Sequence, residues 1–159
     1  MQAAPLTWTL NNAVFGDGGT AVGSFVYDAS TLTVVSYSIQ TSQDAPDFPG
    51  FLYQNGAPNN ISATVFPISD LILFATSFTN GNPNGIQLRL APVAGLTDAG
   101  GVVSLNLNSG LSVECYNCSP HRPFVSGEMV SVPEPATALL VLVPLAWGVL
   151  VRRRLSGRR

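Results

Sequence analysis

Short runs of apolar and β-branched residues alternate with polar turn clusters along residues 6–131. Within several runs every second side chain is apolar, which is typical of strands that bury one face. The ten runs that we expect to form strands are Leu6–Phe15, Thr20–Tyr27, Leu32–Thr41, Phe51–Tyr53, Ile61–Phe66, Leu71–Phe78, Ile86–Leu90, Val102–Leu107, Leu111–Tyr116 and Gly127–Val132. Strands at this spacing predict an all-β fold, either an antiparallel β-sandwich or a barrel. Of the two we expect the antiparallel β-sandwich.

The alternation also predicts which side chains form the core. In the first run, the apolar residues fall on one face only if a bulge occurs at Asn11 and Asn12. In the second and third runs they fall on one face by simple alternation. The side chains that we expect in the core on these grounds are Trp8, Leu10, Ala13, Phe15, Phe25, Tyr27, Val35, Tyr37 and Ile39.

The charges are few and unevenly placed. Only 10% of the residues are charged and none is a lysine, which does not suit a helical cytosolic protein. Residues 1–131 carry two arginines against eight acids, whereas residues 132–159 carry five arginines against Glu134 alone. A protein that binds nucleic acid spreads its cations over a folded face, so we expect no nucleic-acid partner.

An uncharged segment of sixteen residues, Ala136–Val151, precedes the arginine cluster. As a helix it would span about 24 Å, and the stems of Arg152, Arg153 and Arg154 would extend it toward the roughly 30 Å of a bilayer core. The alternative is a buried core helix, but such a helix would show a polar stripe, and Pro144 would cost it about 3 kcal/mol. The pattern predicts a transmembrane helix whose arginines hold the C-terminus in the cytoplasm.

Pro133-Glu134-Pro135 stands directly before this segment and favours an extended backbone. The order of this motif, a short apolar helix and a terminal arginine cluster resembles the PEP-CTERM sorting signal over residues 131–156. That signal is recognised by exosortases, which are integral-membrane cysteine proteases of Gram-negative bacteria. The resemblance implies recognition around Pro133, Glu134 and Pro135, with processing nearby.

The resemblance divides the chain into an exported domain, residues 1–131, and a sorting signal, residues 132–159. It implies exosortase and the inner membrane as partners, and it makes an exopolysaccharide a further candidate. The domain would be periplasmic in transit and then lie on the cell surface or outside the cell. The family normally begins with a cleaved signal peptide, and Met1–Pro5 looks like the small-residue end of one.

The two cysteines, Cys115 and Cys118, form a CxxC pair at the end of a predicted strand. A redox pair normally opens a helix, and a zinc site would need His121 and Glu114 as its further ligands. An oxidising compartment favours a local disulfide over a metal site or free thiols. We therefore predict a Cys115–Cys118 disulfide, with no metal and no cofactor.

No catalytic set stands out in the sequence. His121 lies beside Pro120 in a predicted loop, and Asp44 and Asp47 fit solvated turn acids. The first hypothesis is therefore a non-enzymatic surface or extracellular-matrix protein. Two alternatives stay open. One is a small hydrolase that uses loop carboxylates such as Asp44 and Asp47. The other is a carbohydrate-binding module, for which the candidate exposed aromatic residues are Phe48, Phe51, Tyr53 and Tyr116.

Overall fold

A computed structural model describes residues 4–43, 48–56, 61–67, 70–79, 82–108, 110–116 and 119–132. Every element of regular secondary structure within these residues is a β-strand. They are β1 Leu6–Phe15, β2 Ala21–Asp28, β3 Thr33–Thr41, β4 Leu52–Gln54, β5 Ser62–Phe66, β6 Leu71–Thr79, β7 Asn82–Leu90, β8 Val102–Ser104, β9 Val113–Tyr116 and β10 His121–Val132. Most bounds agree with the predicted runs to within one or two residues.

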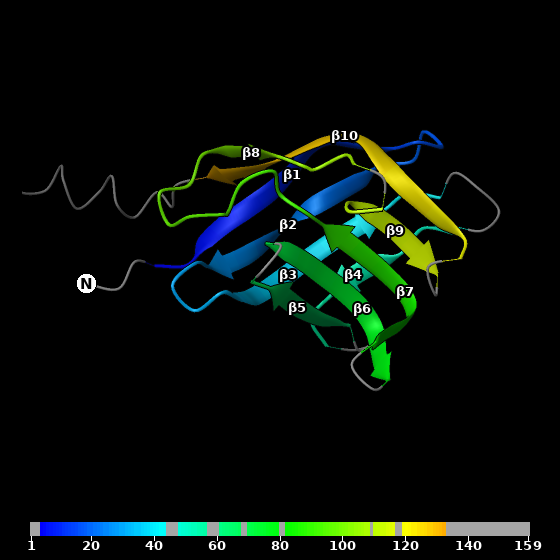
Figure 1. Ribbon diagram of the computed structural model, residues 1–159, viewed down its shortest axis with the longest axis horizontal. Coiled ribbons are helices and arrows are strands. Elements are labelled where there is room, and N and C mark those ends of the chain that lie inside the picture. The colour runs from blue at the N-terminus through cyan, green and yellow to red at the C-terminus, as the bar shows by residue number, and fades with distance from the viewer. Residues whose placement is uncertain are drawn as a thin grey trace, which may run out of the picture.

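The strands form one sheet in the order β4-β3-β2-β1-β10-β9-β7-β6-β5, and β8 adds to β10 outside this path. The sheet curls into a half-barrel, so that β4 and β5 come near one another (Figure 1). Ile61 bridges to Asn55 and Gly56 there, and the Tyr37 hydroxyl donates to the Ile61 carbonyl at 2.8 Å. The predicted all-β antiparallel fold is confirmed, and a single curled sheet takes the place of two separate ones.

The bulge predicted at Asn11 and Asn12 is confirmed. The pairing of β1 with β10 shifts register between Asn11 and Val14, and Asn12 has a φ of 50°. Asparagine tolerates this left-handed conformation better than most residues. The bulge turns Ala13 and Phe15 to the same face as Trp8.

The core fills the inside of the curled sheet. Of the predicted core residues, Val35 is the exception, because its side chain is 54% exposed. The register of β2 and β3 shifts after Val26, so that Tyr27 pairs with Val34 and Val35 becomes an extra residue facing solvent. The buried members of the predicted set are Trp8, Leu10, Ala13, Phe15, Phe25, Tyr27, Tyr37 and Ile39.

Strand β10 begins earlier than the sequence predicts, at His121 and not at Gly127. Pro120 and Pro123 indicated a loop, but a proline is tolerated near the start of a strand. Pro123 pairs with Val113, and its carbonyl accepts a hydrogen bond from Gly16 at 2.9 Å. The first part of β10 therefore pairs with β9, and the later part pairs with β1 and β8.

Candidate functional site

Three charged side chains, Arg122, Glu114 and Asp17, meet on the inner side of the curled sheet, at the end where β9 and β10 begin to pair. Arg122 on β10 and Glu114 on β9 are register partners, and both point toward the interior. Their side chains are 3% and 1% exposed. Because alternate residues of a strand face opposite sides, Arg122 shares the inner face with Phe124.

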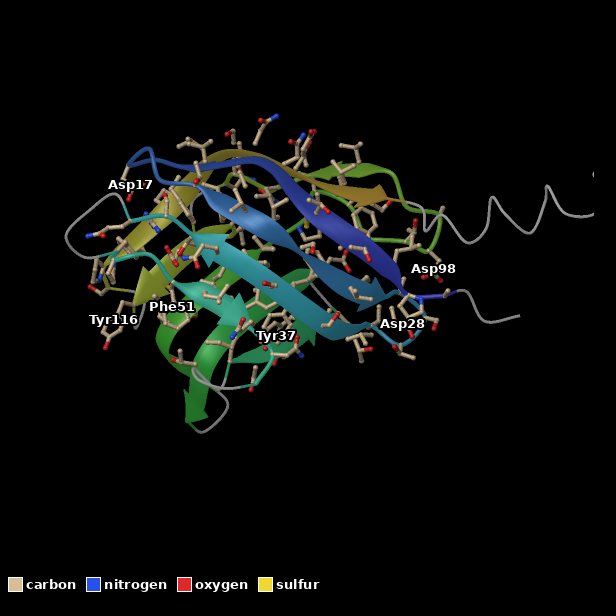
Figure 2. The ribbon with its side chains drawn as sticks, turned by 180° about the vertical axis from the view of Figure 1, so that it is seen from behind. Asp17, Asp28, Tyr37, Phe51, Asp98 and Tyr116 are labelled. Carbon is tan, nitrogen blue, oxygen red and sulfur yellow. The ribbon has the colours of Figure 1, made fainter. Side chains whose placement is uncertain are left out.

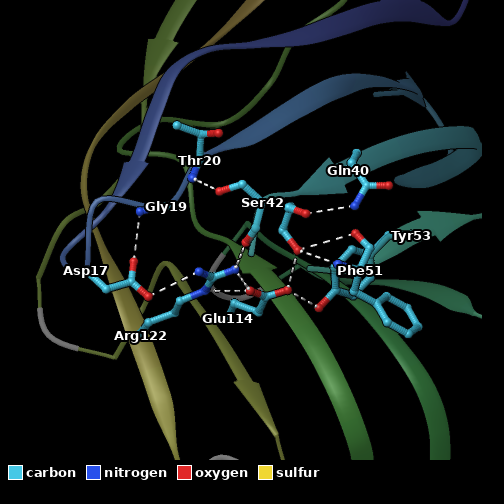
Figure 3. Close-up of polar contacts among 10 residues, drawn as sticks. Asp17, Gly19, Thr20, Gln40, Ser42, Phe51, Tyr53, Glu114 and Arg122 are labelled. Atoms are coloured by element: carbon cyan, nitrogen blue, oxygen red, sulfur yellow. Dashed lines mark hydrogen bonds and ion pairs between the residues drawn. The ribbon is translucent and has the colours of Figure 1, made fainter. Parts of the chain in front are cut away.

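The carboxylate of Glu114 accepts hydrogen bonds at both oxygens (Figure 3). Oε2 lies 2.7 Å from Nε and 2.5 Å from Nη2 of Arg122. Oε1 accepts from the hydroxyls of Thr41 and Tyr53, each at 2.8 Å. This carboxylate is thus held by residues of β3, β4 and β10.

The guanidinium of Arg122 reaches further, to the turn between β1 and β2. Its Nη1 lies 3.1 Å from Oδ2 of Asp17, and its Nη2 donates to the Ser42 carbonyl at 2.9 Å. The rings of Phe15 and Phe48 lie 4.2 and 4.7 Å from the guanidinium carbon. Both contacts are within the range of cation–π attraction.

The local sequence of the turn places Asp17 for this contact. The Gly19 amide donates to Oδ1 of Asp17 at 3.0 Å, which leaves Oδ2 directed at Arg122. Thr20 and Ser42 exchange backbone and side-chain hydrogen bonds beside it. A Cβ atom on Gly19 would lie 2.5 Å from Nη1 of Arg122, so a larger residue here would force the guanidinium to shift.

Burial determines the electrostatics of the cluster. It raises the pKa of the Tyr53 hydroxyl well above its usual value, and the nearby charge of Glu114 and the hydrogen bond to it add to the effect. A general base must be able to reach a proton of a substrate, and Glu114 is enclosed and bonded to three side chains. The arrangement is suited to joining the turn between β1 and β2 with β3, β4, β9 and β10. We call it the Arg122–Glu114 network, and its members are Asp17, Thr41, Ser42, Tyr53, Glu114 and Arg122.

The structure places the predicted cysteine and zinc ligands as follows. Cys115 is buried and disulfide-bonded, whereas Cys118 lies outside the described residues, so its pairing stays a prediction. Glu114 faces the interior and His121 is exposed on the outer face, so the two do not converge. Among the residues that the structure covers, no group of three metal-ligating side chains occurs.

The prediction that His121 belongs to a loop is wrong. It is the first residue of β10, opposite Cys115, because β10 extends through Pro123. Its side chain is exposed to solvent. Asp44 and Asp47 lie outside the described residues.

Two of the four aromatic residues considered for a carbohydrate-binding platform are buried and cannot contact a ligand at the surface. Phe48 is buried against Arg122, and Tyr53 is buried against Glu114. Phe51 is partly buried and packs on Tyr53, with ring centres 4.9 Å apart. Tyr116 is 53% exposed, and Figure 2 shows its side chain at the surface.

The sorting-signal residues Pro133, Glu134, Pro135 and Arg152–Arg154 lie outside the described residues, and so does the segment Ala136–Val151. Within the residues that are described, none belongs to a helix that is long and apolar enough to cross a membrane.

The sequence prediction missed Arg122 as the partner of Glu114, and it missed Asp17 as the second carboxylate that contacts Arg122. The sequence does indicate that Arg122 could be buried. In an extended strand it lies two residues from Phe124 and therefore faces the same side of the sheet as that apolar residue. A charge on the apolar parity of a strand indicates a buried ion pair. For Asp17 no local signal exists, since an aspartate between glycines fits any tight turn.

Comparison of the chain with protein-family models, with curated proteins and with solved structures gives no match.

Proposed function

We propose that the chain is an exported bacterial surface or extracellular-matrix protein, sorted and processed by exosortase through residues 132–159. The observation that carries the proposal is the order of three features at the C-terminus. Pro133-Glu134-Pro135 comes first, the apolar segment Ala136–Val151 follows, and Arg152–Arg154 come directly after it. The first would present an extended backbone to the protease, the second would stop in the bilayer, and the third would fix the orientation.

The position of the signal relative to the fold supports the proposal. The last strand, β10, ends at Val132, where it pairs with Thr7 of β1. Pro133 is the next residue, so cleavage within or after the motif would leave all ten described strands intact. Arg122 and Val132 lie at opposite ends of β10, so the network is at the end of the domain away from the signal. Asp17 marks that end in Figure 2, and Asp28 and Asp98 mark the other.

The character of the domain supports a non-enzymatic role. A hydrolase would need carboxylates that meet in an open site, but Glu114 is enclosed and Asp17 is bonded to Arg122 and Gly19. A carbohydrate-binding platform would need several exposed aromatic residues close together, and Phe48 and Tyr53 are buried. Neither alternative gains support from the described residues, and an exopolysaccharide remains a candidate partner through other contacts.

The proposal is tested by following the C-terminus in cells. The chain would be given an epitope tag after Arg159 and a secretory leader, and then produced in a Gram-negative host that has an exosortase. We expect the tag to be lost from the mature protein, and to be kept in the same host after its exosortase is inactivated. Loss of the tag at equal rates in both hosts would contradict the assignment.

A further inference from the structure

A pocket of about 280 Å³ lies on the outer face of the sheet, between β2 and β3. Four of its lining residues have side chains on this face, because Ser24 pairs with Ser38 and Val26 pairs with Ser36. The other two have side chains buried on the inner face, so they contribute backbone atoms to the floor of the pocket. The lining residues are Ser24, Phe25, Val26, Ser36, Tyr37 and Ser38.

Small side chains between larger ones form this hollow. Ser24 and Ser38 face each other, and the next pair on the same face is Val22 with Gln40. Val22 is 57% exposed at that end, and Val35, the extra residue of the bulge, is 54% exposed at the other end. The serine hydroxyls therefore lie in a depression that has bulkier side chains at both ends.

The serine hydroxyls of the pocket are available to a ligand. Within the part of the chain that the structure describes, the hydroxyls of Ser24, Ser36 and Ser38 form no hydrogen bond with another residue. Ser36 and Ser38 are exposed, and Ser24 is half-buried. Each hydroxyl can donate one hydrogen bond and accept two. Together they offer a ligand both donors and acceptors within one pocket.

The surroundings of the pocket carry almost no charge. Among the residues of β1, β2, β3 and β4, which are all described, the only charged one is Asp28. It lies at the end of β2, and its carboxylate accepts hydrogen bonds from Ser30 and Thr31 (Figure 2). A carboxylate, a phosphate or a nucleic acid would need a cation at this face. The pocket therefore suits a neutral ligand with several hydroxyl groups.

From this arrangement we infer that the pocket binds one ring of a neutral sugar. The hydroxyls of a sugar donate and accept as those of serine do, so the two sets can pair in either direction. Val26 provides an apolar contact for the C–H groups of the ring. The volume is just below the roughly 300–1,000 Å³ of pockets for drug-sized ligands, which suits a single ring. Binding of this kind uses hydroxyls and one aliphatic side chain, so it does not need exposed aromatic residues.

The inference does not rest on the sorting signal, and it can be tested on the full chain of 159 residues in a detergent without a sugar head group. Backbone amide NMR signals of Ser24, Ser36 and Ser38 would be followed during titrations. The probes are D-glucose, D-galactose, D-mannose, D-glucuronate and glycerol. We expect at least one of the three neutral hexoses to shift these signals and to bind more tightly than glycerol. D-Glucuronate should bind no more tightly than D-glucose, because no cation faces its carboxylate.

Variants separate this pocket from general surface binding. Ser36→Ala and Ser38→Ala should each weaken binding of that hexose by about two- to tenfold, because each removes one hydrogen bond to the ligand. Both positions are exposed, so the variants should keep the fold. Ser104→Ala is the matched control, because Ser104 is an exposed serine on β8, and β1 and β10 lie between that strand and β2. It should bind like the wild type.

Three results would overturn the inference. The first is that none of the hexoses shifts the signals of the three serines. The second is that glycerol binds as tightly as the best hexose, or that D-glucuronate binds more tightly than D-glucose. The third is that Ser36→Ala and Ser38→Ala both bind the hexose as the wild type does.

Discussion

Arg122 and Glu114 face each other across β10 and β9 inside the curled sheet, with Nε of Arg122 2.7 Å from Oε2 of Glu114. Taking each ion out of water costs several kcal/mol, and the attraction between the two compensates only if the remaining polar atoms are also bonded. Here Thr41 and Tyr53 bond the carboxylate, and Asp17 and Ser42 bond the guanidinium. The ion pair is therefore stable only together with these additional hydrogen bonds. Removing either charged residue leaves the other one buried without its charge partner.

The first prediction concerns Glu114→Gln. This change removes the negative charge and leaves Arg122 buried, so we expect the free energy of unfolding to fall by about 3–5 kcal/mol. Urea denaturation followed by circular dichroism measures it. Glu128→Gln is the matched control, because Glu128 accepts a hydrogen bond from Asn11 at the surface and glutamine can still accept it. That control should change stability by no more than about 0.5 kcal/mol.

A double variant distinguishes a lost charge partner from a lost packing contact. Glu114→Leu with Arg122→Met removes both ions and keeps similar volumes, so we expect it to be more stable than Glu114→Gln alone. Glu114→Leu and Arg122→Met would also be measured separately. If the double variant lost as much free energy of unfolding as the two single variants together, the broken ion pair would not be the cause of the loss in Glu114→Gln.

The second prediction concerns the turn that holds Asp17. In Gly19→Ala, the new Cβ atom would lie 2.5 Å from Nη1 of Arg122, so the guanidinium must move away from Asp17. We expect a loss of about 1–3 kcal/mol in the free energy of unfolding. Gly16→Ala is in the same turn, and its nearest contact would be an ordinary 3.5 Å to Val125. Thermal denaturation should therefore show Gly16→Ala close to the wild type, and equal losses in both variants would contradict the steric argument.

The third prediction is a loss of stability in alkali. Burial raises the pKa of Tyr53 well above its usual value, and it also raises the pKa values of Tyr27 and Tyr37. Below pH 10 these hydroxyls are protonated in both the folded and the unfolded chain, so they add no pH dependence. Above pH 10 the unfolded chain loses protons that the folded chain keeps, so the free energy of unfolding falls as the pH rises.

For Tyr53 alone this linkage is about 1.4 kcal/mol per pH unit between the unfolded and the folded pKa. Denaturation at several pH values, with tyrosine ionisation followed by absorbance, measures the slope. The variant Tyr53→Phe should be less stable at neutral pH, because Glu114 loses a hydrogen bond. Its slope above pH 10 should be smaller by about one proton, and an unchanged slope would show that Tyr53 does not resist ionisation.

Most of the fold could be predicted from the sequence because strands and turns have local signals. The bounds of β1 were predicted residue for residue, and the bulge at Asn11 and Asn12 followed from the break in its alternation. Val35 could not be placed in the same way, because the bulge between β2 and β3 depends on the register of a pair and not on one strand. The first residues of β10 were not predicted, because the prolines near them indicate a loop. In the structure Pro123 belongs to the strand and pairs with Val113 of β9, which the sequence does not indicate.

The candidate site was harder to predict than the fold. Glu114 was considered only as a possible fourth zinc ligand, whereas the structure encloses it among β3, β4 and β10. Its partners Thr41 and Tyr53 are distant in the chain, and only the curl of the sheet brings them together. Alternation could mark Arg122 as a buried charge, but neither composition nor alternation identifies its partners, which lie on other strands.

The fourth prediction concerns the arginines after the apolar segment. Arg152–Arg154, Arg158 and Arg159 are proposed to hold the C-terminus in the cytoplasm. Replacing all five with serine should remove this preference, so that a C-terminal tag becomes accessible to protease from the periplasmic side in part of the molecules. Protease protection in spheroplasts measures the fraction. Complete protection of the tag in the variant would show that the arginines do not set the orientation.

The last prediction concerns Pro133 and Pro135. Each proline fixes its own φ angle and disfavours a helical conformation of the residue before it, so the motif should keep an extended backbone next to the apolar segment. A protease binds its substrate in an extended form, because the backbone groups must be free to pair with the enzyme. Replacing both prolines with alanine would allow a helix to continue outward from Ala136, since alanine is the strongest helix former. We expect the variant to stay in the membrane with its C-terminal tag uncleaved.

Pro144→Ala is the matched control for this variant, because it removes a proline from the same tail and leaves Pro133-Glu134-Pro135 unchanged. Both variants would be produced in an exosortase-bearing host, and the tag would be followed by immunoblotting of membrane and extracellular fractions. Processing of Pro144→Ala at the wild-type rate, together with retention of the tag when Pro133 and Pro135 are replaced, would show that the motif acts by its conformation. If the variant without Pro133 and Pro135 lost its tag as fast as the wild type, the motif would be an ordinary helix boundary. The proposal that exosortase sorts this chain would then lose its main support.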